Sequence, residues 1–285
     1  DPHTIVFGTD FSMFNAGRTV EGDFDQSSFS PGQKHLEMRL ASLFGYRALR
    51  HGASVLNDYR LRRPMGYNLA DFSLTIPDPP RPRRRAHDQF LGALTNPDTY
   101  GNYRFSAERL EQLEQMVREA AGRSSRVIIV IPPVHALYLE MYHLRGIYED
   151  NESWKRSLAE LAAQARRVHP AKDIRVIDYS GYRGVVAEPM PRGDQPGDQM
   201  RWYSEGSHFK PDLGEVVARD VMNADRVSPR QTPAPELPLH RAELTPETID
   251  AHLRRLRADR DRYIQSHLDD IKFIVEIFRK AEGQR

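Results

Sequence analysis

The chain contains no cysteine, so disulfide bonds and thiolate metal sites are excluded. It has no apolar run close to the roughly 20 residues that a membrane-spanning helix needs. Glycine-rich phrases of the G-x-x-x-x-G-K-S/T or G-x-G-x-x-G type are also missing. A strong charge of one sign is absent, because 41 basic and 40 acidic side chains leave a net charge of +1. We therefore expect neither a nucleic-acid partner nor a nucleotide cofactor.

An initiator methionine is missing as well, and Asp1–His3 leads straight into the strand-like stretch Thr4–Phe7. This abrupt start predicts a processed or truncated product from which a targeting segment or membrane anchor has been removed.

The apolar residues that are present follow an alternation of strands and helices. Three short apolar runs are typical of buried parallel strands: Ile5–Phe7, Val127–Ile131 and Ile174–Ile177. Three further stretches carry apolar residues at helical spacing: residues 106–122, 153–168 and 211–221. This order predicts an α/β fold in which a parallel sheet is covered by helices on both faces.

Two regions do not follow that alternation, and they set the domain boundaries. Residues 1–240 are predicted to form the α/β domain, with residues 59–102 as an irregular insertion. The proline- and arginine-rich stretch Pro77–Arg85 favours an extended, solvated segment, with a basic strip that binds phosphate or a polyanion as the alternative. Residues 241–285 predict one long C-terminal helix, which either packs on its own domain or docks a protein partner or a second copy.

The stretch Trp202–Lys210 holds the strongest candidate site. Glu205 stands three positions before His208, just ahead of the helix that Pro211 begins. A carboxylate beside a histidine fixes its tautomer and stabilises the imidazolium that forms when the histidine accepts a proton. The stretch follows the last predicted core strand, and sites in open α/β sheets form beyond the carboxyl ends of strands. His208 and Glu205 are thus the candidate base and orienting acid, with an ordinary surface histidine as the alternative.

These residues carry a resemblance to the SGNH (GDSL-like) hydrolase superfamily, in particular to its extracytoplasmic branch related to polysaccharide O-acetyltransferases. Glu205–His208 resembles the D-x-x-H block of that superfamily, with Glu in place of Asp, and Phe209–Pro211 continues it. Ile131–Ala136 resembles the proline turn at a strand end in the same branch, and Trp154-Lys155 resembles the W-K of the succeeding helix. The resemblance implies a three-layer, flavodoxin-like α/β fold.

The N-terminal phrase Val6–Asn15 admits two alignments with that superfamily. As the nucleophile block, it would put Asp10 at the position of the serine, with Ser12 two residues late. As a later strand end of the type L-D-F-x-x-F-N, it would supply contacts to the substrate or the oxyanion, and we prefer this alignment. Asp10 and Asn15 are then candidate pocket residues, together with His135 after the proline turn. The preferred alignment implies that the block with the nucleophilic serine lies outside this chain.

The resemblance implies ester hydrolysis or O-acyl transfer on a cell-surface glycan, in the periplasm or another extracytoplasmic compartment. Such chemistry needs no metal or organic cofactor. The alternative is a non-catalytic SGNH-like subunit that binds a glycan or scaffolds a protein partner. A metal site at His135 and His143 lacks a third ligand of clear spacing.

Overall fold

A computed structural model describes residues 3–19, 81–222 and 239–284 of the chain. Its sheet has four strands in the order β1-β2-β3-β4: β1 (Thr4–Gly8), β2 (Arg126–Ile131), β3 (Asp173–Asp178) and β4 (Ala242–Glu243). The first three strands pair in parallel and confirm the three predicted core strands. The sequence did not predict β4, which pairs with the end of β3 in the antiparallel direction and has only two residues.

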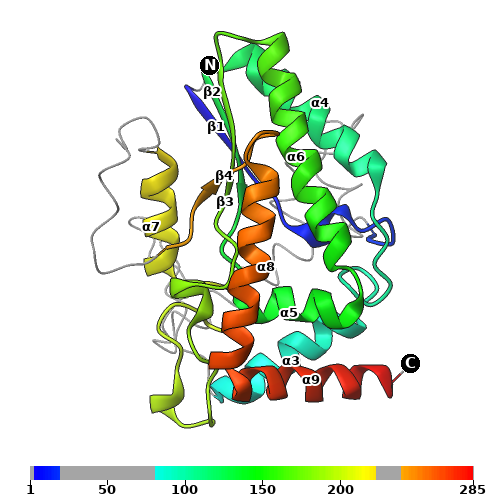
Figure 1. The fold of residues 1–285 in the computed structure, drawn as a ribbon, viewed down its shortest axis with the longest axis vertical. Coiled ribbons are helices and arrows are strands. Elements are labelled where there is room, and N and C mark those ends of the chain that lie inside the picture. The colour runs from blue at the N-terminus through cyan, green and yellow to red at the C-terminus, as the bar shows by residue number, and fades with distance from the viewer. Residues whose placement is uncertain (1–2, 20–80, 223–238, 285) are drawn as a thin grey trace, which may run out of the picture. The chain divides into compact units, whose positions relative to one another are not determined.

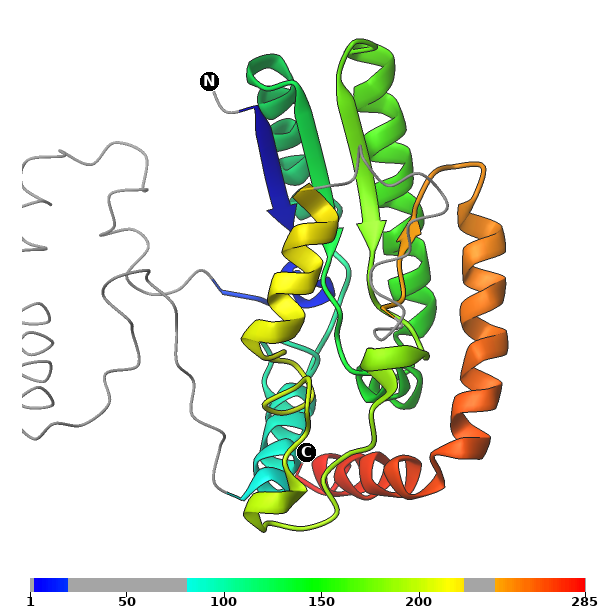
Figure 2. The ribbon, with the colours of Figure 1, turned by 90° about the vertical axis from the view of Figure 1, so that its left-hand side faces the viewer.

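Helices cover both faces of this sheet, as the alternation predicts. The helices α4 (Ala107–Arg123) and α6 (Tyr148–Val168) lie on one face, and α7 (Pro211–Met222) lies on the other (Figures 1 and 2). Ser106 caps α4 by accepting a hydrogen bond from the backbone N–H of Arg109. The described part of the chain therefore has a general α/β fold with a mostly parallel sheet.

Three more helices gather beyond the carboxyl ends of the parallel strands (Figure 2). They are α3 (Pro82–Thr95), α5 (Ala136–Arg145) and α9 (Leu268–Glu282), and α9 packs against the other two. The expected irregular insertion 59–102 is thus wrong from residue 82 to residue 95, where α3 lies. Residues 59–80 fall outside the described ranges.

A helix can begin here because proline is favoured in the first turn, where backbone N–H groups make no hydrogen bond within the helix and the missing N–H of proline costs nothing. Pro82 occupies that position, and the buried residues that follow recur at helical spacing: Ala86, Phe90, Ala93 and Leu94. The arginines therefore stand on a helix and do not belong to an extended segment.

The C-terminal region is two helices, not the single long helix expected. The first, α8, runs over Ile249–Ser266, and the backbone leaves the helical region at His267 (φ −126°, ψ 44°) before α9 begins. The turn lets α9 run across the end of the molecule to α3 and α5 (Figure 1). Leu253 in α8 and Ile274 in α9 are fully buried, so these helices bury apolar surface within their own chain.

None of the helices in the three described ranges is both long enough and apolar enough to span a bilayer.

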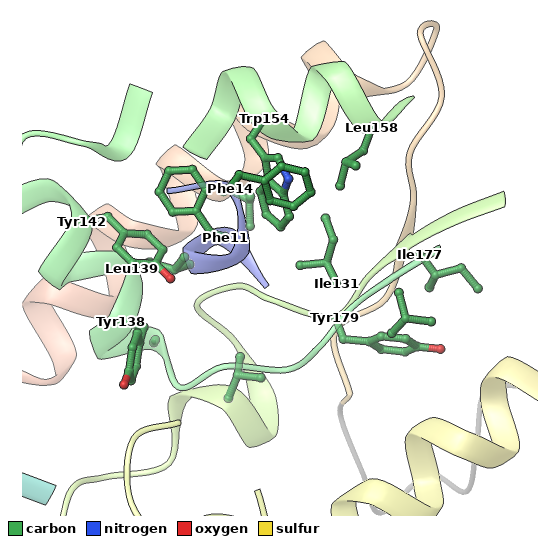
Figure 3. Close-up of a cluster of buried hydrophobic side chains, with 14 of the residues drawn as sticks. Phe11, Phe14, Ile131, Tyr138, Leu139, Tyr142, Trp154, Leu158, Ile177 and Tyr179 are labelled. Atoms are coloured by element: carbon green, nitrogen blue, oxygen red, sulfur yellow. The ribbon is translucent and has the colours of Figure 1, made fainter. Parts of the chain in front are cut away.

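An aromatic cluster connects the end of β1 to the helices on one side of the sheet (Figure 3). Phe11 lies with its ring centroid 5.2 Å from that of Tyr142 in α5 and 5.5 Å from that of Trp154 in α6. Phe14 packs on the same Trp154 ring, also at 5.5 Å. All four rings are buried, and rings at such separations add to the stability gained from burying their area.

Candidate active site

The loop between β3 and α7 ends in a tight turn with Glu205 and His208 at its tip. Tyr203 and Phe209 form an antiparallel bridge across the turn. The backbone N–H of Ser204 donates to the carbonyl oxygen of His208 at 2.8 Å, which closes the turn. Directly after it, α7 begins at Pro211, so the turn is fixed at one end by a helix.

Two neighbouring segments hold this turn from outside. The hydroxyl of the buried Tyr203 donates to the carbonyl oxygen of Pro133 at 2.9 Å. The backbone N–H of His135 donates to the carbonyl oxygen of Gly206 at 3.2 Å. On the other side, a Cβ at Gly206 would stand 2.4 Å from the ring of Phe90 in α3. Glycine is therefore the residue that lets α3 approach the turn this closely.

One carboxylate oxygen of Glu205 organises the tip of the turn. Glu205 Oε1 lies 2.6 Å from His208 Nδ1 and accepts from the His208 backbone N–H at 2.8 Å and from the Ser207 hydroxyl at 2.8 Å. The Glu205 side chain is only 2% exposed, whereas that of His208 is 73% exposed. The buried acid thus fixes the ring through Nδ1, while most of the ring remains exposed.

The charges of the pair shift each other's ionisation. Burial alone would raise the pKa of Glu205, but the hydrogen bonds from His208 and Ser207 outweigh it and lower the pKa to about 2. The hydrogen bond to Glu205 raises the pKa of His208, against smaller opposing effects of partial burial and of the Arg85 charge. The carboxylate of Glu205 is therefore ionised at neutral pH, and its charge stabilises a proton on His208.

An open groove of about 610 Å³ adjoins the pair, with the side chains of α3 as its other wall. Its lining is Arg81, Arg84, Arg85, Asp88, Gln89, Glu205 and His208. Gln89 also reaches behind the turn, where its amide donates to Ser207 Oγ at 3.0 Å and hydrogen bonds to the Tyr138 hydroxyl. Sequence reasoning offered the arginines of this wall only as an alternative, as a basic strip, and missed Asp88 and Gln89, although the buried stripe of α3 was available as a signal.

The other candidate pocket residues lie elsewhere. Asp10 caps the short 3-10 helix Phe11–Phe14, and its Oδ1 accepts from the Ser12 backbone N–H at 2.7 Å and from the Tyr100 hydroxyl at 3.2 Å. Asn15 is fully buried, and its amide nitrogen donates to two backbone carbonyls of the segment 97–99, at 2.7 and 2.8 Å. These contacts hold loops in place.

His135 is fully buried and caps α5, because its Nδ1 accepts from the backbone N–H of Leu137 at 3.2 Å. Its Nε2 donates to the carbonyl oxygen of Glu188 at 2.6 Å. Burial lowers the pKa of His135 to about 4, so the ring is neutral. Among the described residues that line the groove, Asp10, Asn15 and His135 do not occur, and their role in a pocket stays a prediction.

The suggested metal pair is not assembled. The ring of His143 stacks on Tyr148 with centroids 3.6 Å apart, and burial lowers the pKa of His143 to about 4. Within residues 3–19, 81–222 and 239–284, no three histidines or carboxylates come together as ligands for a metal ion.

A second histidine–carboxylate pair lies at the buried end of β3. Asp178 Oδ2 accepts from Lys155 Nζ at 2.7 Å and lies 2.9 Å from His252 Nε2, and Asp178 Oδ1 accepts from the Ser180 hydroxyl at 2.7 Å. All four side chains are buried. Burial alone would raise the pKa of Asp178, but the positive charge of Lys155 and the contact with His252 hold it far below its usual range. Sequence reasoning missed this cluster, for which the Trp154-Lys155 phrase was the only signal.

No protein-family model, no curated protein and no solved structure matches this chain. A function for this chain therefore has to be inferred from the geometry of the site.

Proposed function

We propose that this chain supplies the base and the orienting acid for ester hydrolysis or O-acyl transfer on a cell-surface glycan, as an SGNH-like domain of an extracytoplasmic compartment. One observation carries the proposal: a buried carboxylate, Glu205, holds the Nδ1 side of an exposed histidine, His208, beside an open groove. An orienting acid behind the ring and an accessible nitrogen in front of it are what a general base requires.

In the proposed reaction, His208 Nε2 removes the proton from a serine hydroxyl as the serine oxygen attacks the ester carbonyl. Glu205 stabilises the imidazolium, and hydrogen-bond donors hold the oxyanion. His208 then gives the proton to the departing alcohol, which leaves an acyl-serine. Water or an acceptor hydroxyl then gives its proton to His208 as its oxygen attacks the acyl carbonyl. The bond to the serine oxygen breaks, His208 returns the proton to the serine, and the acid or the new ester is released. The serine comes from outside the described residues.

A second candidate function, a non-catalytic subunit that binds a glycan or a protein partner, is favoured by one observation. Across the described ranges, the serine hydroxyl found in hydrogen-bond contact with the His208 ring is that of Ser207, at 3.1 Å from Nδ1. This is the nitrogen that Glu205 occupies, so Ser207 does not stand where a nucleophile would.

Hydrolysis of p-nitrophenyl acetate separates the two functions. If the proposal is right, the protein hydrolyses this ester, and His208→Ala lowers the rate about 10²- to 10⁴-fold, the range for loss of a general base. His169→Ala, which removes a partly exposed histidine at the end of α6, is the matched control and should keep the full rate.

Thermal unfolding of each variant shows that the fold is intact. Hydrolysis that is lost in His208→Ala would exclude the non-catalytic function, and full activity in His208→Ala would overturn the assignment of the site.

A further inference from the structure

The arginines at the start of α3 divide into two groups by what they contact. Arg83 is engaged in the fold, since its guanidinium donates to the carbonyl oxygen of Pro191 at 2.8 Å and lies 4.6 Å from the ring centroid of Phe273. Arg81, Arg84 and Arg85 instead line the groove beside His208. The side chains of Arg84 and Arg85 are 65% and 49% exposed. Three guanidinium groups therefore face the space that a ligand would occupy.

The two carboxylates of the groove offset this charge only in part. Asp88 is already paired, with His87 Nδ1 at 2.9 Å and with Arg84 at 3.7 Å. Glu205 is almost completely buried, and its charge is directed at His208. Asp88 is itself 61% exposed, so the groove is not purely cationic, but three arginines against two carboxylates leave it a net positive charge in a chain that is nearly neutral.

Arg85 connects this charge to the candidate base. Its Nε lies 3.7 Å from Glu205 Oε2, the carboxylate oxygen on the side away from the histidine contact. An anion bound by Arg81 and Arg84 in the same groove would therefore lie next to His208, and the ligand carrying that anion would extend over the exposed ring.

We propose that the groove binds a saccharide that carries carboxylate groups, so that the substrate class is an acidic glycan. This inference rests on the proposed function for its choice of a glycan ester, but the binding step stands by itself. The planar guanidinium fork matches a carboxylate with two parallel hydrogen bonds. A volume of about 610 Å³ lies within the range of small-molecule sites.

Calorimetric titration with a hexamer of galacturonic acid tests the proposal. The same hexamer with its carboxylates converted to amides is the uncharged control, and an oligomer of glycerol phosphate tests phosphate as the anion. We expect binding of the acidic hexamer that weakens as salt is raised, and at least tenfold weaker binding of the amide. Equal binding of the acid and the amide would overturn the inference, and tighter binding of the phosphate oligomer would overturn the choice of carboxylate.

A pair of double variants locates the site. Arg81→Gln/Arg84→Gln should weaken binding of the acidic hexamer about 3- to 10-fold, as expected for the loss of exposed charge pairs. Arg123→Gln/Arg167→Gln removes the same charge at the exposed ends of α4 and α6, and should leave binding unchanged. Equal weakening by both pairs would show a nonspecific charge effect and overturn the site.

The binding assay and the ester assay test the two proposals separately. Hydrolysis of p-nitrophenyl acetate without any preference for the acidic hexamer would leave the proposed function in place and remove this inference. Binding of the acidic hexamer without hydrolysis of the ester would support the acidic-glycan inference and count against the proposed function.

Discussion

Two histidine–carboxylate pairs occupy the same end of the sheet, yet they differ in almost every respect except their hydrogen bond. In Glu205–His208 the acid is buried and the histidine is exposed. In Asp178–His252 both partners are buried, and Lys155 supplies a positive charge at 2.7 Å from the same carboxylate. The first pair can exchange a proton with a ligand, whereas the second is closed to solvent.

The groups around each pair decide its role. Asp178 is already neutralised by Lys155, so it binds His252 mainly as a fixed acceptor that attaches α8 to the end of β3. Glu205 Oε1 receives neutral donors and one imidazole, and the half-exposed Arg85 lies farther off, at 3.7 Å from Oε2, so the carboxylate charge stabilises a proton on His208. The buried pair therefore stabilises the fold, and the exposed pair is the one to which we assign the proposed chemistry.

Replacing Asp178 should have the largest effect on stability. Asp178→Asn leaves Lys155 as a buried charge without its partner, and we expect a loss of about 3–5 kcal/mol in the free energy of unfolding. Urea denaturation measures this change in the free energy of unfolding. Asp173→Asn, on the same strand and in partly exposed ion pairs with Arg126 and Arg175, should cost less than about 1 kcal/mol.

If both substitutions cost the same, the buried cluster does not hold the fold. The double variant Asp178→Asn/Lys155→Met should recover part of the lost stability, because it also removes the buried, unpaired charge of Lys155.

We expect the position of the Glu205–His208 turn to depend on the close fit of Gly206 against Phe90 more than on the charges of the pair. Gly206→Ala places a methyl group against the ring of Phe90, and we expect a loss of about 1–3 kcal/mol from overpacking. Adding Phe90→Leu should relieve the clash. Gly122→Ala in α4, where a Cβ meets nothing within 4 Å, should instead be neutral or stabilising. A Gly206→Ala variant as stable as the unaltered protein would show that α3 is free to move away from the turn.

The smallest effect should be on the ionisation of His208 itself. Glu205→Gln removes the charge that raises the pKa of His208, so the midpoint of its NMR titration should fall towards the usual histidine value of about 6.5. The titration of His143, whose pKa burial lowers to about 4, is the control and should not move. An unchanged His208 midpoint would contradict the proposed role of Glu205.

The same substitution changes the dependence of stability on pH, with a defined sign. The raised pKa of His208 contributes stability that is fully present below about 6.5 and is lost as the pH rises through the folded-state value. The pKa of Glu205, lowered to about 2, contributes stability that is present above the usual glutamate value of 4.5 and is lost as the pH falls through about 2. Glu205→Gln should lack both contributions. Because His208 is largely exposed, we expect each contribution to be small.

The parts of this fold that follow from local sequence could be predicted. Buried parallel strands produce continuous apolar runs, and β2 is such a run from Val127 to Ile131. The Glu205–His208 pair could be found because its two members are close in sequence and their spacing fits one turn. Ser106 and Pro211 also mark helix starts by their own side-chain chemistry.

The parts that depend on distant partners could not be predicted in this way. Gly206 is explained only by Phe90, which lies on a helix far away in sequence, and the fixed position of Asn15 only by the carbonyls of Pro97 and Thr99. The break at His267 has the same origin, since α9 must leave the line of α8 to reach α3 and α5. No proline or glycine marks that position.

The packing of α9 against α3 has a consequence for the order of events during synthesis. Arg83 and Phe273, which touch in the folded protein, lie far apart in the sequence. A ribosome therefore releases α3 long before α9. The contacts between these two helices form only after α9 has emerged, whereas Phe90 of α3 can pack on Tyr138 of α5 earlier. The wall of the groove is completed only after α9 has been made, so a premature stop before Leu268 would remove its support while leaving Glu205 and His208 in the chain.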